Sequence, residues 1–129
     1  MVLKIIDATQ AKPGATILID GEPYSVKSND VSKSGKHGAS KCRIMAIGVF
    51  SDKKKVLAVP GHERFDVPNV EKKRVQVLSV GEETASVMDL ETYETLDLPY
   101  YHEIKEQLKV DGQAECWEIE GKKVIMRAL

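Results

Sequence analysis

The chain has 129 residues, of which 42% are hydrophobic and 30% charged, and its formal net charge is −1. This composition excludes an intrinsically disordered chain and indicates one ordinary folded domain or two very small ones. Because no apolar run approaches the roughly 20 residues of a membrane span and the apolar start is too short for a signal peptide, we expect a cytoplasmic protein with no membrane partner.

Turn and strand signals dominate the first half of the chain. Pro13-Gly14 is a turn signal before a short apolar run at residues 16–19, and Asp20-Gly21 favours a tight hairpin because both residue types tolerate positive φ. Further strands are expected, in chain order, at residues 24–31, 42–50 and 56–59. The pattern predicts a small antiparallel barrel in which the glycine loop, SKSGKHGAS at residues 32–40, is one long hairpin tip.

A domain boundary is predicted at Pro68-Asn69, where proline breaks a strand and the charge balance changes sign. Residues 1–68 carry 11 Lys and Arg against 7 Asp and Glu, a net charge of +4, whereas residues 69–129 carry 8 against 13, a net charge of −5. This asymmetry indicates two domains, 1–68 and 69–129, that face different partners.

The second half repeats the strand-rich pattern and contains one predicted helix. Its expected strands are residues 74–81, 84–91, 94–99, 114–120 and 122–129, with hairpin turns at Glu91–Glu94 and Gly121-Lys122. Between the third and fourth strands, Tyr100, Ile104 and Leu108 recur at the spacing of one helix face. Five strands with one helix in this place form the layout of an OB-type barrel.

The two cysteines, Cys42 and Cys116, are isolated from each other and from any histidine at ligand spacing. Cysteines of this kind in a cytoplasmic chain are mostly free thiols. The sequence therefore predicts neither a metal site nor a disulfide.

The sharpest local feature is the concentration of positive charge in and just after the glycine loop. Residues 31–43 contain no acid and four cations, which are Lys33, Lys36, Lys41 and Arg43. Lys36 stands between Gly35 and His37, where no neighbouring side chain can pack around it. From composition alone, the favoured interpretation is a solvated hairpin tip.

Three chemical roles are open to a lysine in such a loop. A phosphate-binding P-loop is a poor match, because Asp30 stands where that motif has its first glycine and His37 where it has a hydroxyl residue. A Schiff-base lysine needs a depressed pKa in a pocket, which a glycine-flanked tip does not provide. A carrier lysine, displayed so that an enzyme can extend it, fits the tip, and the positive surroundings suit a negatively charged partner such as RNA.

Residues 32–50, SKSGKHGASKCRIMAIGVF, resemble the hypusine loop of the translation factor 5A family, the archaeal and eukaryotic counterparts of bacterial elongation factor P. Residues 11–26 and 75–99 resemble the family's first hairpin and the opening of its C-terminal domain, and the short tails make the archaeal branch the closer match. The resemblance implies an all-β fold of two small barrels. These are an N-terminal SH3-like barrel, 1–68, that carries the hypusine loop and a C-terminal OB-fold domain, 69–129, with one short helix.

In that family the lysine between glycine and histidine receives an aminobutyl group from spermidine, and by resemblance this lysine is Lys36. Deoxyhypusine synthase makes the transfer with NAD, so the resemblance implies a modified residue and no bound cofactor. Gly35 and Gly38 are expected to let the backbone turn sharply and to leave room for the narrow tunnel of that enzyme. The loop residues expected to contact RNA or the synthase are Lys33, Ser34, Gly35, His37, Gly38, Lys41 and Arg43.

The resemblance implies a translation factor and not an enzyme. Its implied partner is the ribosome stalled at sites such as consecutive prolines, where a hypusine or deoxyhypusine arm on Lys36 lies against the acceptor end of the peptidyl-tRNA. The alternative is a general RNA-binding protein of OB type with no modified lysine. The acidic second half argues against strong nonspecific binding of phosphates by that domain.

Overall fold

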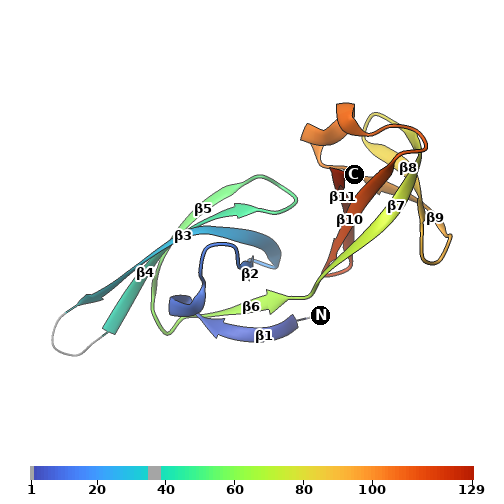
Figure 1. Ribbon diagram of the computed structural model, residues 1–129. Coiled ribbons are helices and arrows are strands. Elements are labelled where there is room, and N and C mark those ends of the chain that lie inside the picture. Colours follow the sequence, from blue (N-terminus) through green and yellow to red (C-terminus); the bar gives the residue numbers. More distant parts are fainter. Residues whose placement is uncertain (1, 35–38) are drawn as a thin grey trace. The chain divides into compact units, whose positions relative to one another are not determined.

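The computed structural model describes residues 2–34 and 39–129 (Figure 1). The chain divides into two compact units, Met1–Asn69 and Val70–Leu129, one residue beyond the boundary expected from the sequence. Strands make up almost all of the regular structure. No helix within the described residues is long and apolar enough to cross a membrane. The predicted all-β fold is confirmed.

Six strands and one short helix form the described part of the first unit. They are β1 (Val2–Asp7), the 3-10 helix η1 (Ala8–Gln10), β2 (Thr16–Ile19), β3 (Glu22–Ser34), β4 (Ala39–Gly48), β5 (Lys54–Pro60) and β6 (Arg64–Pro68). One antiparallel sheet has the order β2-β3-β4-β5, and β1 pairs with β6 in a second sheet that the sequence analysis did not predict. The predicted Asp20-Gly21 turn joins β2 to β3, with φ of 53° and 80° at its two residues.

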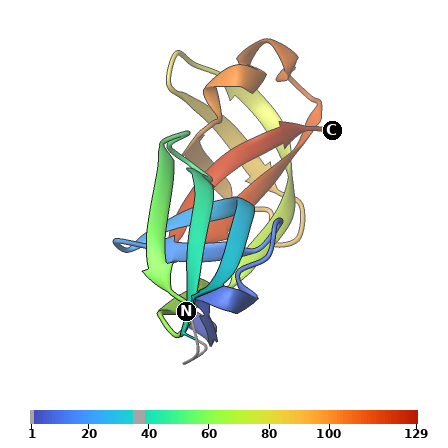
Figure 2. The ribbon, with the colours of Figure 1, turned by 90° about the vertical axis from the view of Figure 1, so that its left-hand side faces the viewer.

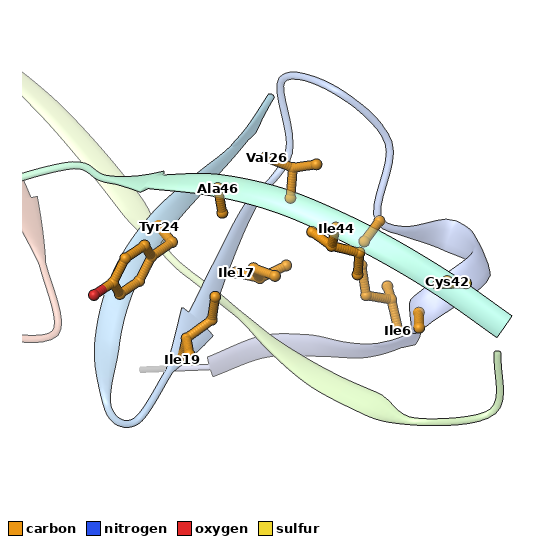
Figure 3. Close-up of a cluster of buried hydrophobic side chains, with 10 residues drawn as sticks. Ile6, Ile17, Ile19, Tyr24, Val26, Cys42, Ile44 and Ala46 are labelled. Carbon is orange, nitrogen blue, oxygen red and sulfur yellow. The ribbon is translucent and has the colours of Figure 1, made fainter. Parts of the chain in front are cut away.

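Strand alternation builds the core of the first unit. Because side chains alternate between the two faces of a strand, every second residue of β4 points inward. The inward side chains of β4 meet those of β1, β2 and β3 (Figure 3). The labelled members of this cluster are Ile6, Ile17, Ile19, Tyr24, Val26, Cys42, Ile44 and Ala46. The residues between the inward positions of β4, such as Lys41 and Arg43, are left on its outer face.

The second unit is a five-stranded sheet with the order β11-β10-β7-β8-β9. Its elements are β7 (Val70–Val80), β8 (Thr84–Asp89), β9 (Thr95–Pro99), the 3-10 helix η2 (His102–Gln107), β10 (Gln113–Ile119) and β11 (Lys122–Ala128). As predicted, the helix lies between the third and fourth strands. A single parallel bridge from Tyr100 to Ile125 joins the two edges of the sheet, so the sheet curls into a barrel.

The helix differs from the prediction in type, start and end. It is a 3-10 helix of six residues, His102–Gln107, whereas the apolar spacing predicts a helix that includes Tyr100 and Leu108. The backbone of Tyr100 is held extended by the bridge to Ile125, and its hydroxyl donates to the carbonyl oxygen of Gly81 at 2.7 Å. The two other residues of the predicted apolar face are buried as expected, and these are Ile104 and Leu108. The segment closes the barrel and holds the β7–β8 turn (Figure 2).

One buried carboxylate organises the turn between β8 and β9. Asp89 is only 6% exposed, and its Oδ1 accepts hydrogen bonds from the backbone N–H groups of Glu91, at 2.8 Å, and Thr92, at 3.2 Å. The hydrogen bond from Glu91 is the main reason that the pKa of Asp89 lies below its ordinary value of 3.8. The ionised carboxylate is therefore the form that the folded turn needs.

Replacing Asp89 with alanine is expected to lower the free energy of unfolding by about 1–2 kcal/mol, because two turn N–H groups lose their acceptor. Asp89→Asn keeps an acceptor at this place and is expected to cost less. Urea denaturation of both variants near neutral pH measures the difference. Equal stability of Asp89→Ala and the wild type would show that these hydrogen bonds do not hold the turn.

The same carboxylate gives stability a defined pH dependence. Because its pKa is lower in the folded than in the unfolded chain, its contribution is complete above the ordinary value of 3.8 and is lost as pH falls through the folded value. The stability difference between the wild type and Asp89→Asn is thus expected to shrink below about pH 4.

Candidate nucleic-acid interface

The β3–β4 hairpin carries every predicted site residue that the structure describes. The two strands run out from the rest of the first unit (Figure 1), and their pairing continues to Ser34 opposite Ala39. The strands extend closer to the loop than the predicted ranges 24–31 and 42–50. The remaining predicted residues, Gly35, Lys36, His37 and Gly38, lie outside the described residues.

The register of the hairpin divides the predicted basic loop between two faces. Lys41 pairs with Ser32, and Arg43 pairs with Asp30, so these two cations are two residues apart on one face of β4. Lys33 pairs with Ser40 and therefore points to the opposite face. All three cations are exposed. The hairpin presents positive charge on both sides and not on a single surface.

Asp30 is the acid that the sequence analysis did not connect with this site. It lies immediately before the acid-free segment, yet the strand pairing puts it directly opposite Arg43. Opposite charges at such a cross-strand position attract each other and contribute some tenths of a kcal/mol. Positive charge on this face is thus less compensated at Lys41, nearer the loop, than at Arg43.

Gly61 holds the loop end of β4 at close range. Its N–H donates to the carbonyl oxygen of Ser40 at 2.8 Å, and its own carbonyl oxygen accepts from the N–H of Thr9 at 3.4 Å. A Cβ atom at Gly61 would lie 2.7 Å from the Cβ of Ser40 and 3.0 Å from Thr9 Cγ2. Only glycine permits this approach. The sequence analysis ended the preceding strand at residue 59 and did not predict this contact.

Asn29 ties the middle of β3 to the segment around η1. Its Nδ2 donates to the carbonyl oxygens of Ala8, at 2.8 Å, and Ala11, at 2.9 Å. Both acceptors follow β1 in the chain, so the side chain joins distant parts of the first unit. A single asparagine in a strand gives no sequence signal of this role, and the sequence analysis missed it.

The lysines at residues 53–55 belong to the structure of the barrel and not to a site. Lys53 and Lys54 are exposed, as a solvated turn predicts. Lys55 Nζ instead lies 2.6 Å from Asp20 Oδ2 and 5.4 Å from the ring centre of Tyr24. The hydrogen bond between Lys55 and Asp20 lowers the pKa of the carboxyl and raises the pKa of the ammonium. This pair connects the β2–β3 turn to β5.

Neither cysteine forms part of a site in the described residues. Cys42 and Cys116 are free and buried, and burial raises the pKa of both thiols. Within residues 2–34 and 39–129, no group of three or more His, Cys, Asp or Glu side chains could hold a metal ion.

The fold and the basic hairpin together define a two-domain β protein, an SH3-like barrel followed by an OB-fold. The solved structure of eukaryotic translation initiation factor 5A from Methanococcus jannaschii superposes with a TM-score of 0.87 at 36% identity, covering 98% of this chain and 94% of that chain. A translation initiation factor eIF-5A family protein from Naegleria fowleri superposes with a TM-score of 0.82 at 26% identity, covering 99% of both chains.

Sequence comparison agrees with the structural likeness. The family model described as translation initiation factor 5A-like, N-terminal, matches residues 4–62. Translation initiation factor 5A from Archaeoglobus fulgidus is 41% identical and covers 95% of each chain. The factor of that name from Pyrococcus horikoshii is 40% identical over 95% of this chain and 91% of its own. The chain belongs to the translation initiation factor 5A family, and the resemblance identified from the glycine loop is confirmed.

Proposed function

We propose that this protein promotes peptide-bond formation on ribosomes stalled at sites such as consecutive prolines. It acts there through an arm built on Lys36 and is not itself an enzyme, since the ribosome carries out the chemistry. Membership of the translation initiation factor 5A family is the observation that carries the proposal. We place this activity in the cytoplasm, where the ribosomes are.

The hairpin that brackets Lys36 supports this role physically. Beyond the end of β5 it narrows to a two-stranded ribbon, with exposed Lys33 on one face and exposed Lys41, which still pairs with Pro60 of β5, on the other. Such a ribbon is thin enough to enter a crevice lined by RNA, and cations on both faces suit phosphates on both walls. Asn29 ties the middle of β3 to the barrel and Gly61 holds Ser40 near the loop end of β4, so the direction of the ribbon is set by the barrel.

The modification gives Lys36 reach without removing its charge. With NAD, deoxyhypusine synthase transfers the aminobutyl group of spermidine to the ε-amine of Lys36. The C–N bond between the aminobutyl and aminopropyl parts of spermidine breaks, a new C–N bond to Lys36 forms, and diaminopropane leaves. The product carries a secondary amine and a new terminal amine. The resulting deoxyhypusine or hypusine arm lies against the acceptor end of the peptidyl-tRNA. Two ammonium groups on a thin aliphatic chain can orient that end by charge and hydrogen bonds.

An intact mass and a peptide map of the protein from its native source test the proposal. An aminobutyl addition on the peptide that contains Lys36 is the expected result. An unmodified Lys36 in the native protein would instead support the alternative, a general RNA-binding protein of OB type.

Ribosome binding is expected to weaken as salt rises, because several cations of the hairpin meet phosphates. Reversing the charge of Lys33 and Lys41 together is expected to weaken binding by roughly tenfold or more at low salt. The double change alters both faces of the hairpin. A single reversal alters only one face and is expected to weaken binding less. Cosedimentation with ribosomes over a series of salt concentrations measures both effects.

The matched control reverses Lys53 and Lys54, which are exposed in the same unit at the turn before β5. It changes net charge equally and is expected to leave ribosome affinity within about twofold. If the two double variants bind equally well, the charge of the hairpin has no special part in binding.

A further inference from the structure

Positive charge in the second unit is concentrated on two strands. Residues 70–129 contain eight Lys and Arg residues, of which six lie on β7 or β11. These six are Lys72, Lys73, Arg74, Lys122, Lys123 and Arg127. An OB-fold most often binds oligonucleotides on its second and third strands, which here are β8 and β9. Residues 75–104, which include both of those strands, contain no Lys or Arg.

The strand register gathers part of this charge on the outward side of the sheet. In β10, which lies between β7 and β11 (Figure 1), Glu115 pairs with Arg74 on one side and Arg127 on the other. Trp117 pairs with Lys72 in the same way. Directly opposed residues of antiparallel strands point to the same side, and the cysteine between Glu115 and Trp117 is buried in the core. The outer basic face is therefore Lys72, Arg74, Glu115, Trp117 and Arg127.

Side-chain contacts give this face a fixed arrangement. Trp117 Nε1–H donates to Glu115 Oε1 at 2.8 Å, and Lys72 Nζ lies 4.5 Å from the centre of the indole ring. Arg127 Nη1 lies 3.9 Å from the same carboxylate oxygen, and its side chain is 63% exposed. Arg74 and Lys72 are also exposed. Three cations thus surround one carboxylate, which leaves an excess of positive charge.

The net negative charge of the second half argues against strong phosphate binding by the unit as a whole, but its cations are gathered on one face. We propose that the outer basic face binds RNA through its phosphates. A guanidinium group can form two parallel hydrogen bonds to a phosphate, and the face presents two of them. Arg74 and Arg127 stand two strand spacings apart, about 9.6 Å along the sheet, so that one RNA backbone can reach both. Trp117 is half-buried, with its N–H bonded to Glu115, and serves to position Lys72 and Glu115. This contact goes beyond the proposed function and does not require modification of Lys36.

The test uses the full chain made in a bacterial host, with Lys36 unmodified, and a labelled single-stranded RNA of mixed sequence. Affinity is measured by fluorescence anisotropy between about 50 and 200 mM NaCl. Arg74→Gln with Arg127→Gln is expected to lower affinity by roughly tenfold at the lower salt concentration and to reduce the salt slope by about 1.4, the value for two phosphate contacts. Arg74→Lys with Arg127→Lys keeps the charge and is expected to keep the slope.

Lys105→Gln with Lys109→Gln is the matched control, because it removes the same charge from the same unit outside the outer basic face. Equal losses in the two glutamine variants, with melting curves unchanged, would overturn the proposal by making net charge the only cause. If Arg74→Gln with Arg127→Gln leaves RNA affinity unchanged but weakens the binding of polyglutamate, the proposal is overturned in favour of an acidic protein partner. Either outcome leaves the function proposed for Lys36 untouched, since none of these variants alters that residue.

Discussion

Replacing Lys36 with arginine is expected to abolish the stimulation of synthesis through a run of prolines while leaving the melting temperature unchanged. Arginine keeps the positive charge, but its guanidinium stays protonated and cannot act as the attacking amine. On the proposed function, deoxyhypusine synthase cannot extend it, and the arm is never made. A change of this kind in a polar loop alters the free energy of unfolding by less than about 0.5 kcal/mol.

The measurement replaces the native gene with the Lys36→Arg form and follows synthesis of a polyproline reporter beside a melting curve. Lys53→Arg is the matched control, because it makes the same chemical change at an exposed lysine of the same unit outside the hairpin. That control is expected to support synthesis normally. Normal synthesis by Lys36→Arg itself would make Lys36 an ordinary solvated lysine.

Replacing Ile44 with alanine is expected to lower the free energy of unfolding by about 3 kcal/mol. Ile44 lies on β4 with none of its surface exposed, among the side chains that form the core of the first unit (Figure 3). Its truncation loses apolar burial and leaves a cavity that neighbours from three other strands fill only in part. A unit of this size has a small core, so the loss is a large share of its stability.

Ile5→Ala makes the identical chemical change at an isoleucine that is 58% exposed on β1. It is expected to cost less than about 1 kcal/mol, since little buried surface is lost. Far-UV circular dichroism during urea denaturation is the suitable probe, because the single tryptophan, Trp117, lies in the second unit. Equal midpoints for the two variants would contradict the burial of Ile44 as the source of the effect.

Local patterns in the sequence predicted much of this fold. Asp20-Gly21 identified a hairpin because a tight turn needs positive φ at both positions, and φ is 53° and 80° there. Ile104 and Leu108 identified a buried helix face between the third and fourth strands of an OB-type barrel, and both residues are buried. Each of these signals depends on residues that are neighbours in the chain.

The β1–β6 sheet could not be predicted in this way. Its strands are about sixty residues apart, as in the pairing of Ile5 with Asp66, and no local pattern encodes such a partner. Pro68 was interpreted as a strand breaker, yet it is the last residue of β6, where a proline is tolerated at the end of an edge pairing. Similarly, the first strand of the second unit was expected to begin at Arg74, but β7 begins at Val70, so Lys72 and Lys73 also lie within it.

The candidate site was predictable in its residue types but not in its geometry. The motif around Lys36 was sufficient to identify the family, and the cations beside it were identified from composition. Which face each cation occupies depends on the register of β3 against β4, and sequence does not fix that register when both faces of a hairpin are polar. The opposition of Asp30 and Arg43 and the separation of Lys33 from Lys41 were therefore visible only in the structure.

The contact of Gly61 with Ser40 also fixes the position from which the length of the hairpin can be counted in cross-strand pairs. It holds Ser40 against the barrel, and of the described cross-strand pairs one, Ser34 with Ala39, lies beyond it. Each cross-strand pair adds about 3.4 Å of length and turns all later side chains to the opposite face. A hairpin that keeps the orientation of its tip can therefore lengthen or shorten only in steps of two pairs, about 6.8 Å. Insertions and deletions of that size change the length of the hairpin but keep the orientation of the side chains at its tip.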